Sequence, residues 1–383
     1  MTSTNLLLMI NKLTDGYYLR QIMTITALYI LGSIFLHITD EHEEKFGILM
    51  AFPMGLAFYA VTGAFLLMTG IEFNALTAVL APILIVIIIA LLRRKKIQIK
   101  IGKEEIAAIV LVAAIAAFAS SGVLSVSVSN DSVYYYSSFP AMLVKAGAYA
   151  KSFDTYLTNV GQTSAVINCL PFLYGFDTTF GIQHFININF LLIFAYVLYE
   201  DSIAFWKSKK TAIALAIAGT LFLASSTPFI VISKWVLSNV YFMEFSFILF
   251  YLLKRNRDNE KGFAYSEFVL FALVTMLRQE GTAMVLLFII AASSFSYSNK
   301  KLALNFVLPV FAIEALYYMM LFLRLGVDPL YSFLDWKKAV LVLGAGLSVG
   351  VYVSVIRKRY LKLLSDNINF VLIMAVALGD TEL

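Results

Sequence analysis

The chain has 383 residues, of which 61% are hydrophobic and only 14% are charged. A typical globular protein carries about 25% charged residues, so this chain has too few to cover a surface in water. The composition therefore excludes a soluble enzyme, a nucleic-acid-binding protein, a disordered chain and a disulfide scaffold. It predicts an all-α polytopic integral membrane protein. Cys169 is the only cysteine, which excludes an intrachain disulfide and a Cys-rich metal site.

A helix needs about 20 apolar residues to cross the hydrocarbon core of a bilayer. Runs of roughly this character predict spans over 21–38, 46–69, 73–92, 104–126, 181–199, 211–231, 236–253, 302–323, 338–356 and 367–379. Two further regions fit less well. The segment 161–175 is short and polar in places, and the segment 263–298 is interrupted by Arg278-Gln279-Glu280-Gly281. We therefore expect about ten to thirteen membrane helices.

Lysine and arginine residues indicate how these helices are oriented. They gather in short loops at 93–103, 207–210, 254–261, 300–301 and 357–362. Because cytoplasmic loops carry an excess of positive charge, all of these loops are predicted to lie inside the cell. The net charge of +5 is explained in the same way. Counting back from Arg93 puts the N-terminus outside.

Two loops on the same side must be joined by an even number of crossings. This parity predicts that 161–175 does not cross, but forms a re-entrant or surface helix on the outer side. It also predicts that 263–298 forms two short helices with the Arg278–Gly281 segment at an outer tip. That arrangement keeps two charges out of the bilayer centre, where each costs about 2.5–3.5 kcal/mol.

Parity places the longest polar stretch, residues 127–160, outside. Residues 133–150 are apolar and aromatic enough to lie along the membrane surface as an amphipathic helix. The outer face would then gather aromatic rings such as that of Tyr134 with carboxylates, cations and an amide, namely Asp131, Asp154, Gln162, Lys234, Arg278, Glu280, Arg324, Asp328 and Asp335. A carboxylate can accept a proton from a hydroxyl group, and arginine and lysine can bind a phosphate. Such a boundary suits a substrate with a lipid tail and a polar head.

Four motifs occur in an order that resembles a known family. The first motif, which follows a predicted span, is Asn130-Asp131-Ser132-Val133-Tyr134-Tyr135. The second, Gly161-Gln162, opens a short apolar segment, and the third, which leads into another span, is Phe180-Gly181-Ile182-Gln183-His184. The fourth lies far downstream and is Leu277-Arg278-Gln279-Glu280-Gly281. This order resembles the polytopic glycosyltransferases of the GT-C superfamily, which use sugars linked to polyprenyl phosphate. The resemblance covers roughly residues 104–300.

The resemblance implies a division of the chain and a role for its acidic loop. Residues 1–103 would be an N-terminal three-span region, and 104–383 a GT-C-like membrane core. The outer soluble domain that often follows in the family is absent, which predicts either a fragment of a longer reading frame or a naturally short form. In the family an acidic residue early in the first large outer loop is the proposed base, and an Arg-x-Glu-Gly element is common on a later hairpin.

These motifs therefore imply transfer of a sugar from a polyprenyl-phosphate donor to a glycan, lipid or protein acceptor outside the cytoplasmic membrane. Asp131, or less directly Asp154, would be catalytic. Lys234, Arg278, Glu280, Gln162 and Tyr134 would bind the substrates. A divalent metal ion is left open, since no ligand set in the sequence demands one, and no nucleic acid is expected.

Simpler interpretations stand beside these. Asp131 and Asp154 could cap a helix or solvate the loop, Arg278 and Glu280 could form a structural ion pair, and Lys234 could anchor a helix at the interface. Tyr134, with Tyr135 and Tyr136, is most simply interpreted as part of an interfacial aromatic belt, and a sugar-stacking role for one ring is the alternative. A transporter or flippase for lipid-linked sugars, and a non-catalytic envelope-assembly protein, remain the alternative functions.

Overall fold

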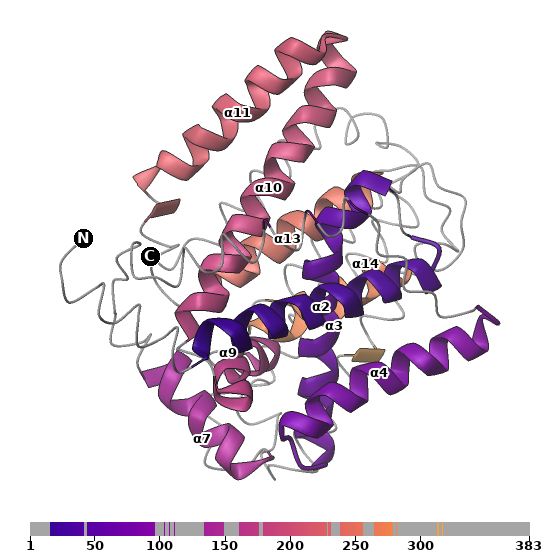
Figure 1. The fold of residues 1–383 in the computed structure, drawn as a ribbon, viewed down its shortest axis with the longest axis vertical. Coiled ribbons are helices and arrows are strands. Elements are labelled where there is room, and N and C mark those ends of the chain that lie inside the picture. Colours follow the sequence, from indigo (N-terminus) through magenta and orange to yellow (C-terminus); the bar gives the residue numbers. More distant parts are fainter. Residues whose placement is uncertain are drawn as a thin grey trace, which may run out of the picture.

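The computed structural model describes residues 16–41, 44–95, 134–148, 161–175, 179–227, 229–230, 238–255 and 264–278, with the single residues 103, 107, 111, 281, 312, 313 and 316. Every element within these ranges is helical, as the composition predicts (Figure 1). The helices are α2 (Tyr17–Ile38), α3 (Glu44–Thr69), α4 (Ala75–Leu92), the π-helical turn η1 (Tyr134–Ser138), α7 (Phe139–Ala146), α9 (Gln162–Tyr174), α10 (Thr179–Trp206), α11 (Lys209–Ser225), α13 (Ser238–Arg255) and α14 (Tyr265–Leu277).

Four of these helices are long and apolar enough to cross a membrane. The crossing segments are Leu19–Ile38 in α2, Gly47–Thr69 in α3, Ala75–Leu92 in α4 and Phe185–Trp206 in α10. They coincide closely with the predicted spans at 21–38, 46–69, 73–92 and 181–199, although α10 continues seven residues beyond its predicted end. The protein is therefore an integral membrane protein with an all-α polytopic fold.

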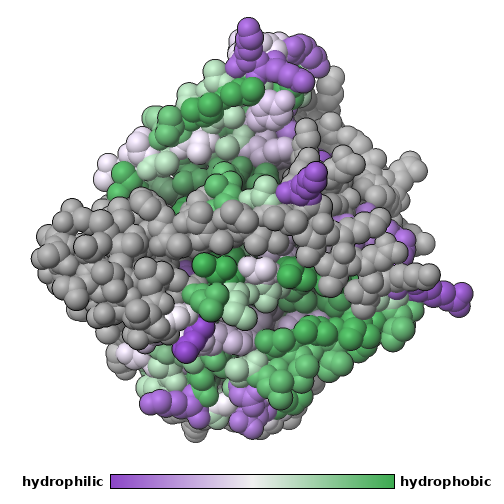
Figure 2. Space-filling model, in the orientation of Figure 1, coloured by the Kyte–Doolittle hydropathy of each residue, from purple (hydrophilic) through white to green (hydrophobic). Residues whose placement is uncertain are grey.

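Helix α4 shows how such a helix packs when both of its faces are apolar. Its buried residues are Ala78, Pro82, Val86 and Ala90, which recur every fourth position and are small or compact. Its larger side chains point outward and form a continuous hydrophobic surface in Figure 2, including Leu76, Leu80, Ile83, Leu84, Ile88 and Leu91. Because lipid is as apolar as leucine, residue size selects the packed face of this helix.

The same rule brings α2 and α3 into close contact. Gly32 of α2 and Gly55 of α3 lie so close to the opposite helix that a Cβ atom on either would overlap a backbone carbonyl oxygen, Ala51 O in one case and Leu28 O in the other. Only glycine permits this approach, which lets the two backbones gain dispersion energy along their length. The pair α2–α3 is thereby a rigid unit at the centre of the fold.

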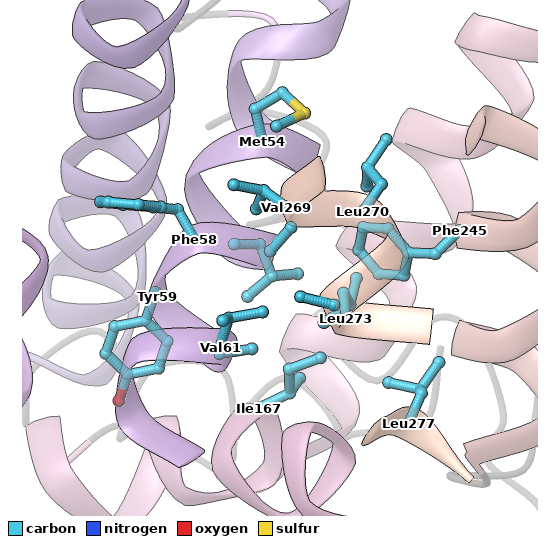
Figure 3. Close-up of a cluster of buried hydrophobic side chains, with 14 of the residues drawn as sticks. Met54, Phe58, Tyr59, Val61, Ile167, Phe245, Val269, Leu270, Leu273 and Leu277 are labelled. Atoms are coloured by element: carbon cyan, nitrogen blue, oxygen red, sulfur yellow. The ribbon is translucent and has the colours of Figure 1, made fainter. Parts of the chain in front are cut away.

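Helix α3 also packs against helices α9 and α14. Its residues Met54 and Val61 lie in one cluster with side chains from α14, including Val269 and Leu273 (Figure 3). The Phe58 ring of the same helix points toward α2, where its centroid lies 5.0 Å from that of Phe35. Ile167 of α9 and Phe245 of α13 complete the same cluster. The predicted N-terminal region and the predicted core therefore share one hydrophobic interior.

Two short helices follow the pattern that parity predicts. Helix α9 has 13 residues, a length of about 20 Å, which is less than the roughly 30 Å of a hydrocarbon core. Residues Gln162 to Pro171 are all buried, so α9 is enclosed by protein, which favours the re-entrant alternative over the surface one. Helix α14 also has 13 residues and ends at Leu277.

The α14 end is a chain reversal, as predicted for the 278–281 tip. Arg278 has extended backbone angles, and the Gly281 N–H donates a hydrogen bond to the Arg278 carbonyl at 3.0 Å. Gly281 then lies against the carbonyl oxygens of Val274 and Thr275, where a Cβ atom would not fit.

The remaining predicted elements are partly covered by the described residues. Helix α11 packs antiparallel beside α10 (Figure 1) and corresponds to the predicted span 211–231, and α13 corresponds to 236–253. Within the predicted amphipathic segment 133–150, η1 and α7 form a helix that buries Pro140 and Leu143 and exposes Met142. The predicted spans at 104–126, 302–323, 338–356 and 367–379 lie almost wholly outside the described residues.

We expect Gly55→Leu to separate α2 from α3, because its side chain would occupy the position of the Leu28 carbonyl. Overpacking of this kind costs on the order of 3 kcal/mol and should appear as a clear drop in the thermal unfolding midpoint of the detergent-solubilised protein. Gly219→Leu is a matched control, because a Cβ atom there meets only the flexible end of the Leu198 side chain. Equal losses in the two variants would contradict the proposed backbone contact.

Candidate functional site

The described helices meet in polar contacts at two opposite ends. At one end, Asp40 between α2 and α3 pairs with Arg93 at 3.1 Å and with Lys95 at 2.9 Å, both just beyond α4. Arg93 also donates to the Thr39 carbonyl at 2.8 Å and lies over the Tyr265 ring at 5.2 Å. Arg93 and Lys95 belong to the loop 93–103, which is predicted to lie inside the cell. Counting back over the two predicted spans 46–69 and 73–92 puts Asp40 on the same side, and the ion pairs bring these loops together.

At this end a carboxylate from one loop caps a distant helix. Glu41 accepts hydrogen bonds from the backbone N–H groups of Tyr265 at 2.7 Å and Ser266 at 2.8 Å. These are the first residues of α14, whose own N-cap residue, Ala264, has no side-chain acceptor. Glu41 therefore satisfies the unpaired donors of the α14 N-terminus and complements its positive dipole end. Burial raises the pKa of Glu41 above its ordinary value, although these hydrogen bonds and one from Thr39 oppose the shift.

Helices α10 and α13 make a second polar contact where both reach their C-terminal ends. Glu200 accepts hydrogen bonds from the hydroxyls of Tyr196 and Tyr251 and pairs with Arg255 at 3.4 Å. Asp201 pairs with Lys254 at 2.8 Å. Lys254 and Arg255 begin a loop that the sequence predicts to lie inside the cell, as it does the loop that follows α10.

The opposite end holds the candidate site. Gly161, immediately before α9, has a positive φ of 83° and lies directly against the Leu277 carbonyl and the Arg278 backbone nitrogen, so that a side chain would not fit. Two residues further, the Thr163 hydroxyl donates a hydrogen bond to the Leu273 carbonyl at 3.1 Å. The start of α9 and the end of α14, more than 100 residues apart in sequence, are thus in backbone contact.

The described part of the loop that is predicted to lie outside, η1 and α7, contacts the same end. The Phe73 N–H, between α3 and α4, donates to the Gly147 carbonyl at 2.6 Å just after α7. The Tyr136 hydroxyl of η1 and the Ser238 hydroxyl at the start of α13 share a hydrogen bond of 2.9 Å. Helix α7 packs on α9, with the Cys169 thiol donating to the Pro140 carbonyl. The loop predicted to lie outside therefore forms part of the site.

Two of the predicted site residues are fully placed by the structure, and they are neighbours. Gln162 follows the Gly161 contact and is completely buried, and neither its amide nitrogen nor its amide oxygen has a hydrogen-bond partner among the described residues. Arg278 is partly buried on the other side of that contact. A buried amide without partners is costly, and this makes Gln162 a candidate for contact with a polar substrate group.

The other predicted site residues are described only in part or lie outside the described residues. Tyr134 begins the η1 turn, but its side chain lies outside the described residues. Asp131, Asp154, Lys234 and Glu280 also lie outside them, so their roles stay predictions. Within the described part of the chain, no group of three or more His, Cys, Asp or Glu side chains could hold a metal ion.

The sequence reasoning missed a polar group in the interior. Glu244 of α13 is completely buried, and Tyr241, one turn before it, donates its hydroxyl proton to the Asn168 amide oxygen of α9 at 3.0 Å. A signal was present, because Glu244 is a single carboxylate within the predicted span 236–253 and ionisable residues within spans are expensive.

Comparison of the chain with known protein families, with curated proteins and with solved structures finds no match. The assignment of a function therefore depends on the sequence motifs and on the geometry described above.

We expect Glu41→Ala to destabilise the protein by about 1–2 kcal/mol, the range measured for loss of a helix N-cap. The α14 N–H groups lose their acceptors, so amide hydrogen exchange at Tyr265 and Ser266 should accelerate most. Asp40→Ala, which removes the exposed ion pairs with Arg93 and Lys95, each worth about 0–1 kcal/mol, is the neighbouring control. A larger effect at Asp40 would contradict the capping role of Glu41.

The raised pKa of Glu41 also predicts a pH dependence. Between its ordinary pKa of 4.5 and its higher folded value, the folded protein binds more protons than the unfolded chain. The contribution of Glu41 to stability therefore falls as pH rises through this window and then levels off. Glu41→Gln cannot titrate but keeps an acceptor oxygen, so its unfolding midpoint should fall less than that of the unmodified protein from about pH 4.5 upward. Parallel curves for the two proteins would show that Glu41 does not titrate in this range.

Proposed function

We propose that this protein is a membrane glycosyltransferase that moves a sugar from a polyprenyl-phosphate donor to a glycan, lipid or protein acceptor at the outer face of the membrane. The observation that carries the proposal is the backbone contact of Gly161 with Leu277 and Arg278. It makes Gln162 and Arg278 neighbours, and both were expected to bind substrate from motifs far apart in the sequence.

The position of this contact suits a substrate that enters from lipid. Helix α9 does not span the bilayer and α14 ends at Leu277, so the site lies where two short helices terminate. The partly buried Arg278 guanidinium provides paired donors for a lipid phosphate. The Gln162 amide provides one donor group and one acceptor for sugar hydroxyls.

The reaction would be a single displacement with inversion. The Asp131 carboxylate takes the proton of the acceptor hydroxyl as that oxygen bonds to the anomeric carbon. The bond from the anomeric carbon to the phosphate oxygen breaks, and its electron pair leaves with the polyprenyl phosphate. Arg278 and Lys234 stabilise the additional negative charge on that phosphate. The leaving group is already a stable anion, so little acid catalysis is needed.

A transporter for lipid-linked sugars is the second candidate, and one observation favours it. Glu244 is a carboxyl group deep within the helices, and transporters place ionisable groups at this depth. The other ionisable groups of the described helices gather at the two ends, which favours the enzyme.

The test uses the full chain in lipid nanodiscs with a panel of radiolabelled polyprenyl-phosphate sugars, and it measures both sugar transfer and release of polyprenyl phosphate. We expect Asp131→Asn to reduce transfer by about 10²–10⁴-fold, the usual contribution of a general base. Arg278→Lys should weaken donor use, because lysine cannot bind a phosphate with two parallel hydrogen bonds.

Asp201→Asn is the matched control, because Asp201 is an exposed carboxylate at the opposite end of the molecule and pairs only with Lys254 among the described residues. It should leave transfer unchanged. Full activity in Asp131→Asn would overturn the base assignment. Absence of transfer with every donor, together with movement of lipid-linked sugar between leaflets, would establish the transporter instead.

A further inference from the structure

Helix α13 carries a row of polar side chains along one face. Ser238, Tyr241, Glu244, Tyr251 and Arg255 follow one another at intervals of three, three, seven and four residues, which keeps them on the same side of a helix. The row extends over about 25 Å. At its first end Ser238 bonds to Tyr136, and at its last end Tyr251 and Arg255 bond to Glu200.

Glu244 lies near the middle of this row and differs from the other members. Its side chain has no exposed surface, and neither carboxyl oxygen has a hydrogen-bond partner. Tyr241, one helical turn away, bonds to the Asn168 oxygen, while the Asn168 amide nitrogen and the nearby Ser164 hydroxyl on the same face of α9 lack partners. The site therefore offers both acceptors and donors that the described residues leave unused.

The charged groups on the elements around α13 are engaged elsewhere. Glu200 and Asp201 of α10 pair with Arg255 and Lys254 at the C-terminal end of α13. On α14, Glu267 is in the first turn and Arg278 follows the last residue, so both are at helix ends, and both have interactions of their own. His184 is on α10, with its side chain outside the described residues. No cation among the described side chains pairs with Glu244.

A lone carboxylate in such a place is too costly to remain ionised without a counter-ion. Transfer of an isolated charge into an apolar interior is opposed by desolvation, and the group takes up a proton instead. We infer that Glu244 is an intramembrane proton-binding site, which exchanges its proton through Tyr241 and Asn168 with the end of the protein that holds α7 and α9. This inference does not depend on the proposed glycosyl transfer.

Proton exchange is expected toward one end of α13 because the neighbours of Glu244 are polar in that direction and apolar in the other. Toward the α7 end, Tyr241 and Ser238 follow Glu244 within about 9 Å along α13, and the Ser238 hydroxyl shares a hydrogen bond with the Tyr136 hydroxyl of η1. Toward the other end, buried Ile248 separates Glu244 from Tyr251, a distance of about 10 Å along the helix. Among the described residues, the row of polar groups on this face of α13 therefore continues without a break in one direction only, because Ser246, the next polar residue toward Tyr251, lies on another face of the helix.

Infrared spectroscopy of the full chain in bilayers tests the protonation state directly. The difference spectrum between the unmodified protein and Glu244→Gln at neutral pH should contain the carbonyl stretch of a protonated carboxylic acid. The band should shift when the buffer is exchanged for D₂O. Glu200→Gln is the matched control on a carboxylate that accepts three hydrogen bonds, and it should remove carboxylate bands only. Glu244→Asp should retain an acid band if Glu244→Gln fails to fold.

The route is tested by the rate of the D₂O shift. Tyr241→Phe removes the hydroxyl and should slow the shift by about an order of magnitude, the equivalent of one lost hydrogen bond. Ile248→Val, on the opposite side of Glu244, should leave the rate unchanged. Loss of carboxylate bands alone in Glu244→Gln would overturn the proton site. An acid band that never shifts in D₂O, or that shifts equally fast in Tyr241→Phe, would overturn the exchange route.

Discussion

Close approach of helix backbones is the constraint on which this structure depends. In a bilayer, lipid and side chains are equally apolar, so the hydrophobic effect does not drive one helix against another. The backbones of the described helices approach closely at small or compact residues, at Gly32 with Gly55, at Gly161 beside Leu277, and along Ala78, Pro82, Val86 and Ala90 of α4. Larger side chains fill the interior between α3, α9, α13 and α14. Dispersion contacts between closely spaced backbones then supply the cohesion.

This packing leaves the short helices with ends that must be satisfied by other parts of the chain. The N-terminus of α14 receives its acceptors from Glu41, which is more than 200 residues away in sequence. The carbonyl of Gly175, the residue that follows α9, accepts a hydrogen bond from the side chain of Arg20 in the first turn of α2. The α2–α3 unit thus holds α9 and α14 in place, and these two helices position Gln162 and Arg278.

Polar groups in the interior have a different meaning from those at the ends. The ion pairs of Asp40 and Asp201 are exposed and contribute little to stability. Gln162 and Glu244 are fully buried with polar atoms unpaired, which costs free energy that packing elsewhere must offset. A buried polar side chain whose atoms are unpaired can be retained because it binds a ligand. We propose a different ligand for each residue, a sugar for Gln162 and a proton for Glu244.

The sequence by itself determined the class of fold, most helix positions and the grouping of charges at the helix ends. Composition and the length of apolar runs suffice for this, because a bilayer permits few structures and its thickness sets their length. The break at Arg278 and the short α9 were predictable for the same reason, since a charge or a short segment cannot cross.

Only the tertiary structure decided which helices touch. The apolar faces of α4 are equivalent in hydropathy, and the glycine contacts depend on a partner that no local pattern identifies. The structure also decided that Glu41 caps α14, that Gly161 places Gln162 beside the Arg278 backbone, and that Glu244 has no hydrogen-bond partner in the part of the chain that the structure describes. Each is a relation between segments distant in sequence, so its energy depends on three-dimensional packing and not on local periodicity.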